Sequence, residues 1–157
     1  MNEAQRFLRQ AVELARDNIK SGGRPFGAVV VNNGKVIATG VNEIHLSDDL
    51  TDHAELLAIR SAARTHGAAA LKGSTVYASG HPCPMCLAAM RIAGVGKIAY
   101  AHSNEDGEPF DLSTAAIYAE LKRPFAEQSM AISHVPLPNE TGQTLYAQWV
   151  QAQKGSA

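Results

Sequence analysis

The chain has 157 residues, 45% of them hydrophobic, which is enough for one buried core and short for two, so we expect a single domain over residues 1–157. No apolar run approaches the about 18 residues of a membrane helix, and the polar start of the chain is unlike a signal peptide, so a cytoplasmic protein with no membrane contact is expected. Lysine and arginine number 14 against 15 aspartate and glutamate, without the basic footprint typical of nucleic-acid enzymes, which favours small free substrates.

The first expected elements are a helix and a hairpin. Asn2 is suited to cap a helix that ends at Ser21–Gly23. Its apolar stripe of helical period consists of Phe7, Leu8, Ala11, Val12, Leu14, Ala15 and Ile19. Residues 26–31 are a short apolar strand, and the turn signal Asn32–Gly34 leads to a returning strand over residues 35–41. Two antiparallel strands are therefore expected to open a sheet.

Two more helices are each predicted to follow a loop. Residues 55–66 have helical character, and Gly67 is placed to end that helix. A strand over residues 75–79 leads to a second helix, with Pro84 in its first turn and Gly94 after its last turn.

The remainder of the chain continues the alternation of strands and helices. We expect strands over residues 97–101 and 130–135, and helices over residues 113–122 and 140–153. The packing residues expected in the last helix are Leu145, Trp149 and Val150. This order predicts an α/β protein, a three-layer α/β/α sandwich around a mixed five-stranded sheet.

One imidazole and two thiols have the composition of a catalytic zinc site. They are His53 and, after a gap, Cys83 and Cys86 in a Cys-x-x-Cys pair. Zinc favours tetrahedral nitrogen and sulfur ligands, and a catalytic zinc keeps one of its four positions open. The chain has only two cysteines, so a four-cysteine structural site is excluded. The sequence therefore predicts one Zn²⁺ held by these three ligands.

Glu55 is predicted to carry protons beside this zinc. It lies two residues after His53. An ideal helix turns about 100° per residue, so the two side chains would point to opposite sides in mid-helix. Both are therefore expected where the loop enters the helix, and Cys83 is expected at the start of the next one. Joined to the Cys-x-x-Cys pair, His-x-Glu matches the signature of zinc nucleobase deaminases.

Other kinds of site fit these residues less well. A Cys-x-x-Cys pair also occurs in redox dithiols, but a dithiol needs neither the flanking Pro82 and Pro84 nor the upstream His-x-Glu. The other histidines, His45, His66, His81, His102 and His134, lack paired ligand spacing. His81 stands close enough to Cys83 to bind zinc in principle, and a solvated or supporting role is expected for it. Two cysteines that both bind metal leave none for a disulfide, which fits a reducing compartment.

With these residues placed, the chain resembles the cytidine deaminase-like superfamily and, within it, the small bacterial guanine deaminases. The segments that carry the resemblance are Arg24–Val31, Asn42, Thr51–Glu55 and Pro82–Cys86. They are shared with tRNA adenosine deaminases and bear on the chemistry more than on the substrate. The resemblance implies a zinc-dependent hydrolase of a free purine base, guanine plus water giving xanthine plus ammonia, with one zinc per subunit.

The resemblance also implies the residues that meet the substrate. The stretch Glu108–Asp111 with Ile117–Tyr118 is similar to a segment of guanine deaminases in which an aspartate reads the base, a catalytic role that falls to Asp111. Asn42, Phe26 and Ala54 are expected to bind the substrate. Plainer roles stay open, because Asn42 could support its loop, Phe26 could be core, and Asp111 could cap a helix.

The resemblance further implies a homodimer with a swapped C-terminal segment, whose terminal aromatic residue closes the partner's site. The present sequence ends Gln153–Ala157, so Tyr146 or Trp149 is expected to take that place, or the aromatic lid is missing. Alternative substrates are tRNA adenosine, a nucleoside, cytosine or an aminated triazine, and the alternative to an enzyme is a structural zinc module.

Overall fold

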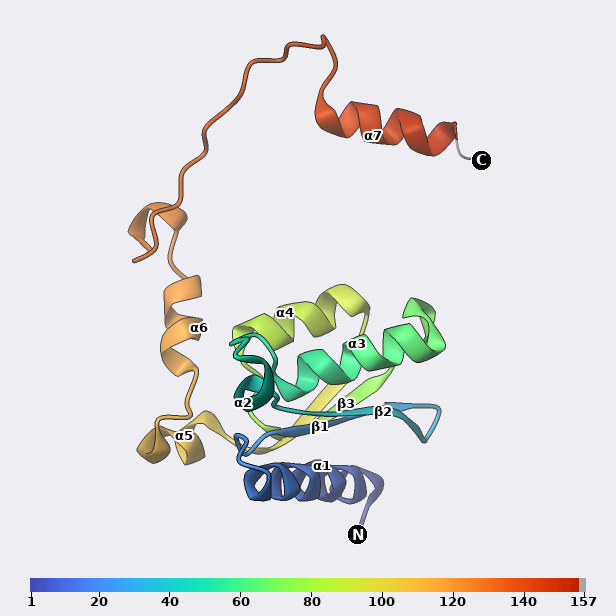
Figure 1. The fold of residues 1–157 in the computed structure, drawn as a ribbon, viewed down its shortest axis with the longest axis vertical. Helices are drawn as coiled ribbons and strands as arrows, with labels where there is room; N and C mark the ends of the chain where they lie inside the picture. The colour runs from blue at the N-terminus through green and yellow to red at the C-terminus, as the bar shows by residue number, and fades with distance from the viewer. Residues whose placement is uncertain (156–157) are drawn as a thin grey trace. The chain divides into compact units, whose positions relative to one another are not determined.

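The computed structural model describes residues 1–155 (Figure 1). The chain divides into two units, Met1–Lys122 and Arg123–Ala157, and each is described by itself. Residues 156 and 157, the last two of the expected tail, lie outside the described residues.

The first unit is built on a mixed sheet of four strands. They are β1 (Gly27–Asn32), β2 (Lys35–Val41), β3 (Thr75–Gly80) and β4 (Lys97–His102), in the order β2-β1-β3-β4. β1 pairs antiparallel with both β2 and β3, and β3 pairs parallel with β4. The four strands expected up to residue 102 are confirmed, and their mixed pairing is as predicted.

Helices cover both faces of this sheet (Figure 1). Helix α1 (Glu3–Lys20) packs on one face, against β1 and β3, while α3 (Ala54–His66) and α4 (Pro84–Ala93) lie on the other. As predicted, Asn2 caps α1, and its side chain accepts a hydrogen bond from the backbone N–H of Gln5. The three-layer arrangement is therefore present in this unit.

The central strand β1 joins two hydrophobic clusters because its side chains alternate between the faces. Ala28 and Val30 belong to the cluster under α3 and α4, whereas Val29 and Val31 pack with Phe7 of α1. All four strand residues are buried. A strand covered on both faces reads as an uninterrupted apolar run, which is what the sequence shows here.

Shorter helices connect the main elements. They are α2 (Ile44–Ser47), η1 (Ala68–Leu71), α5 (Asn104–Gly107), η2 (Glu108–Phe110) and α6 (Ala115–Leu121). The last of these lies within the helix expected over residues 113–122. Among residues 1–155, no helix combines the length and the apolar character needed to cross a bilayer.

The second unit differs from the prediction. It contains η3 (Phe125–Glu127) and α7 (Leu145–Lys154). The predicted strand over residues 130–135 is wrong, because these residues pair with no strand in the described chain. The sheet of the described residues therefore has four strands and not five. An apolar run becomes a strand only where a neighbour satisfies its backbone groups, and composition alone cannot supply that neighbour.

The closing helix is also shorter and more exposed than predicted. It starts at Leu145, where Thr144 accepts a hydrogen bond from the backbone N–H of Ala147, instead of at residue 140. The side chains expected to pack are exposed, namely Leu145, Trp149 and Val150. Nearly every described residue of this unit is exposed to solvent.

Two glycines let helices approach the sheet closely. A Cβ atom at Gly40 of β2 would lie 2.4 Å from the carbonyl oxygen of Ala54, at the start of α3. A Cβ atom at Gly27 of β1 would lie 2.4 Å from the carbonyl oxygen of Ala11 in α1. Since these neighbours are backbone atoms, a larger residue must displace a whole helix.

The substitution Gly40→Ala is therefore expected to lower the free energy of unfolding by about 1–3 kcal/mol, the usual cost of overpacking. It should also weaken zinc binding, because it moves the start of α3, next to His53. Gly27→Ala is the matched control and should lose stability while keeping zinc affinity. Chemical denaturation and zinc titration measure both quantities, and wild-type stability of Gly40→Ala would contradict the close contact.

Candidate active site

The three predicted metal ligands converge at the starts of two helices. His53 is the N-cap of α3, Cys83 is the N-cap of α4, and Cys86 lies in the first turn of α4. Their ligand atoms all lie within 4.8 Å of one another. The Nδ1 atom of His53 is 3.4 Å from the Sγ atom of Cys83 and 3.7 Å from that of Cys86.

This spacing fits a tetrahedral zinc ion. Bonds of about 2.0–2.1 Å to nitrogen and 2.3 Å to sulfur at a tetrahedral angle place the two ligand atoms about 3.5–3.6 Å apart. The two nitrogen–sulfur distances bracket that value. Within the described residues the cluster contains no fourth ligand, whether a histidine, a cysteine or a carboxylate. The donor set therefore fits a catalytic zinc with one open position.

The local sequence explains why these side chains point away from their helices. Both N-cap residues have extended backbones, with φ and ψ of −81° and 151° at His53 and −70° and 164° at Cys83. Each cap carbonyl accepts the first helical hydrogen bond, from Leu57 and Leu87 respectively. The backbone N–H of Cys86 also donates to the Sγ atom of Cys83, at 3.4 Å. The predicted placement of both ligands at loop-to-helix junctions is confirmed.

Glu55 is a buried carboxyl group beside the three ligands. It is the second residue of α3 and is 5% exposed. Burial raises its pKa to about 7, because the low dielectric of the interior disfavours the charged form. A carboxyl group with a pKa near neutral pH both accepts and donates a proton readily, which suits general acid–base chemistry.

Without metal, the ligand cluster holds protons that zinc must displace. The thiol of Cys86 donates a hydrogen bond to Cys83 and, with His53 nearby, lowers the pKa of Cys83 to about 4. The same hydrogen bond and burial raise the pKa of Cys86. The pKa of His53 is raised chiefly by its hydrogen bond with Cys83, against burial and the positive charge of Arg24. The two thiols and the imidazole therefore share their protons within one hydrogen-bonded cluster.

A cavity of about 230 Å³ opens beside this cluster and brings together residues that are distant in sequence. It is lined by two of the ligands, His53 and Cys83, and by Glu55. The four predicted substrate residues also line it, namely Phe26, Asn42, Ala54 and Asp111. The remaining lining residues are Arg24, His81, Leu112, Ser113, Thr114 and Ile117. The sequence predicts no role for Arg24, because a single cation in a loop forms no motif that points to a function.

Phe26 and Asn42 flank the hairpin of β1 and β2, and each both supports the structure and lines the cavity. Asn42 is 2% exposed, and its Oδ1 atom accepts a hydrogen bond from the backbone N–H of Ile44, so it does support its loop. Its amide NH2 group is left to face the cavity. Phe26 lies just before β1, and a Cβ atom at Gly80 would be 3.1 Å from its ring. Phe26 therefore packs against the core and lines the cavity at once.

Asp111 has an unusual backbone conformation for a residue with a side chain. Its φ of 58° and ψ of 37° lie in the left-handed region, which few residues other than glycine adopt. It follows η2 and does not cap the next helix, because Thr114 is the N-cap of α6. Asp111 is instead the C-cap residue of η2, where its backbone N–H donates to the carbonyl oxygen of Glu108.

His81 contributes a side wall to the cavity and lies outside the ligand cluster of the described residues. Its ring centre is 4.8 Å from that of Tyr100 and 5.6 Å from that of Tyr118. The hydroxyl group of Tyr118 donates to the carbonyl oxygen of Pro82, next to Cys83. Residues around α6 are thereby tied to the start of α4.

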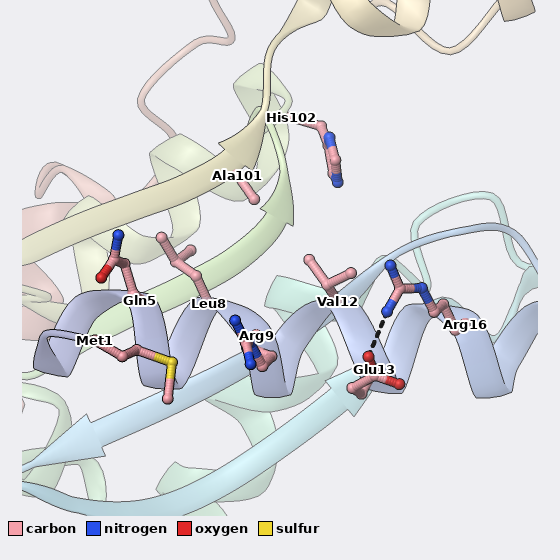
Figure 2. Close-up of a pocket in the computed structure, with 9 residues that line it drawn as sticks. All are labelled: Met1, Gln5, Leu8, Arg9, Val12, Glu13, Arg16, Ala101 and His102. Atoms are coloured by element: carbon pink, nitrogen blue, oxygen red, sulfur yellow. Dashed lines mark hydrogen bonds and ion pairs between the residues drawn. The ribbon is translucent and has the colours of Figure 1, made fainter.

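A larger cavity, of about 650 Å³, lies elsewhere and lacks this chemistry. Figure 2 shows that it runs along α1 near Ala101 and His102 at the end of β4. It contains no cysteine, and its carboxylate, Glu13, is paired with Arg16. The smaller cavity beside the zinc ligands is therefore the candidate active site.

Comparison with known proteins identifies the family. The model of the cytidine and deoxycytidylate deaminase zinc-binding region matches residues 1–102. The guanine deaminase of Bacillus subtilis (strain 168) is 39% identical over 132 residues, which cover 83% of this chain and 85% of that protein. A tRNA-specific adenosine deaminase of Agrobacterium fabrum (strain C58) is 35% identical over 107 residues, 68% of this chain and 70% of that protein.

The fold agrees with that assignment. The X-ray structure of guanine deaminase from Bacillus subtilis superimposes with a TM-score of 0.82 at 35% identity, covering 100% of this chain and 96% of that one. The chain therefore belongs to the family of the cytidine and deoxycytidylate deaminase zinc-binding region. It is a zinc-dependent hydrolytic deaminase, and His53, Cys83 and Cys86 form its zinc site.

Zinc affinity is predicted to rise with pH. Because the pKa values of Cys86 and His53 are raised in the metal-free site, zinc binding near neutral pH must release protons from them. Calorimetric titration in buffers of different ionisation enthalpy measures this release. If zinc affinity stayed constant between about pH 6 and pH 8, binding would release no proton. That result would contradict the proposed ligand set.

Proposed function

We propose that this protein deaminates a free purine base, converting guanine and water to xanthine and ammonia. The observation that carries the proposal is the small cavity beside the zinc ligands, in which two of the ligands, the buried Glu55 and the four predicted substrate residues meet. A volume of about 230 Å³ suits a single heterocycle. The similarity to the guanine deaminase of Bacillus subtilis over most of both chains supports the same substrate.

The chemistry depends on one carboxyl group that moves protons. A zinc ion held by His53, Cys83 and Cys86 would supply a water molecule whose pKa is lowered to about 7. Glu55, buried beside the ligands, accepts a proton from the attacking water and passes it to ring nitrogen N3 of guanine. With N3 protonated, the oxygen of that water adds to C2 and forms the new C–O bond. The proton of the new hydroxyl group then moves through Glu55 to the C2 amine, the C–N bond breaks, ammonia leaves, and C2 keeps the oxygen as the carbonyl of xanthine.

The remaining cavity residues are proposed to hold the base. The NH2 group of Asn42 donates to an acceptor atom of the base, and the ring of Phe26 contacts the face of the purine. Ala54, fully buried, forms part of the cavity wall beside Glu55. Asp111 presents a carboxylate that accepts hydrogen bonds from N–H groups of the substrate and takes part in proton transfer.

The substitution Glu55→Gln should retain zinc and lose nearly all turnover, because the amide keeps the shape of the side chain but cannot carry the proton. General acid–base groups contribute about 10²- to 10⁴-fold to rate, so a loss of at least this order is expected. Ammonia release from guanine by zinc-loaded protein measures it, and metal analysis confirms the zinc content. A variant with substantial activity would remove Glu55 from the assigned role.

The substrate itself is tested by the wild-type protein in the same assay. Release of ammonia from guanine supports the purine assignment. Absence of turnover in a folded, zinc-replete sample would keep the deaminase chemistry and move the substrate to a nucleoside, another heterocycle or tRNA.

We also propose that the whole chain, 1–157, works as one deaminase domain in a cytoplasmic homodimer with a swapped C-terminal segment. The second unit leaves several large hydrophobic side chains exposed, among them Met130, Val135, Leu145 and Trp149, and a partner subunit would bury them. Two free cysteines suit a reducing compartment.

Light scattering with size exclusion is expected to give the mass of a dimer at micromolar concentration. A swap further predicts complementation, in which full-length Glu55→Gln and a chain of residues 1–122 are each inactive and regain activity when refolded together. The active site of the short chain, which keeps Glu55, would then be completed by the C-terminal segment of the long chain. A monomer with full activity would contradict the proposal.

A further inference from the structure

We propose that Arg24 determines specificity by reading the edge of guanine that carries O6 and N7. The inference rests on the proposed guanine deaminase function. Arg24 lies in the loop between α1 and β1 and lines the candidate active-site cavity. Glu55 and Cys83 form the buried end of that cavity, whereas Arg24 is exposed, which places it at the solvent end.

The guanidinium group of Arg24 is free to bind a ligand. Within residues 1–155 it makes no hydrogen bond and no ion pair, unlike Arg16 and Arg60, which each pair with a carboxylate. A guanidinium presents several N–H donors in a rigid fork and carries no acceptor. The group therefore offers donors to whatever occupies the cavity.

Hydrogen bonds hold the backbone of Arg24, whereas its side chain makes none to the described residues. The buried Asn18 donates from Nδ2 to the carbonyl oxygens of Arg24, at 2.8 Å, and of Asn42, at 2.9 Å. The backbone N–H of Phe26 donates to the same carbonyl oxygen of Arg24, at 2.8 Å. Pro25 further restricts the residue before it to extended conformations. One buried amide thus ties Arg24 to Asn42 across the rim of the cavity.

The shape of the substrate determines what this cation would meet. When C2 of guanine, the carbon that loses its amine, faces the zinc ligands, O6 and N7 lie on the edge that points away from them. Both atoms are acceptors, and their spacing matches the fork of arginine, the pairing by which arginine commonly reads guanine in DNA. The negative Asp111 on the same cavity accepts from N–H groups instead, so the two side chains complement opposite edges.

The test compares guanine with 7-deazaguanine, which keeps O6 and lacks the N7 acceptor. For Arg24→Gln, kcat/KM for guanine should fall about 10- to 100-fold, the range of one bidentate pair. The fall for 7-deazaguanine should be several-fold smaller. Arg24→Lys keeps the positive charge but lacks the two parallel N–H donors of a guanidinium group. This variant should therefore also lose the preference for guanine over 7-deazaguanine. Arg64→Gln, an equal charge change at an exposed residue in the last turn of α3, should leave both substrates unaffected.

Binding of both bases to the Glu55→Gln protein gives a readout that does not depend on turnover, and Arg24→Gln in that background should weaken guanine selectively. Equal effects on the two bases, or no effect, would overturn the role of Arg24 and leave the proposed function standing. If zinc-replete wild-type protein neither binds nor deaminates guanine, the proposed function and this inference fall together.

Discussion

The site depends on one constraint, that two helices must begin at the same place. His53 and Cys83 are each the residue before a helix, where the backbone is extended and the side chain is free to turn away from the helix axis. The first turn of α4 then supplies Cys86, whose backbone N–H also donates to Cys83. A shift of either helix by one residue would break the convergence, so the packing of α3 and α4 on the sheet sets the metal geometry.

The same helix starts control the electrostatics. A helix N-terminus has exposed N–H groups and a positive dipole, which stabilise thiolates and a carboxylate close to it. Glu55 nevertheless keeps a pKa near 7, because its burial outweighs the favourable contributions around it. Burial therefore brings the pKa of this carboxyl group into the neutral range, which suits the proton transfer proposed for it.

The chemistry of the site could be predicted from sequence because it depends on local spacing. His53, Glu55 and the Cys-x-x-Cys pair each sit beside recognisable helix starts, and Pro84 and Gly94 mark the limits of α4. The fifth strand, over residues 130–135, could not be predicted correctly, because forming it requires a neighbour that no local pattern specifies. Arg24 was missed for the related reason that a cavity wall is assembled from distant segments.

The central claim is that three protein ligands, one nitrogen and two sulfur, hold the zinc and leave a position for chemistry. Zinc X-ray absorption spectroscopy tests this most directly on the loaded protein. For this ligand set we expect two sulfur ligands at about 2.3 Å and two lighter ligands at about 2.0–2.1 Å, one of them from His53. Four protein-derived ligands, or a shell without two sulfurs, would contradict an open catalytic site.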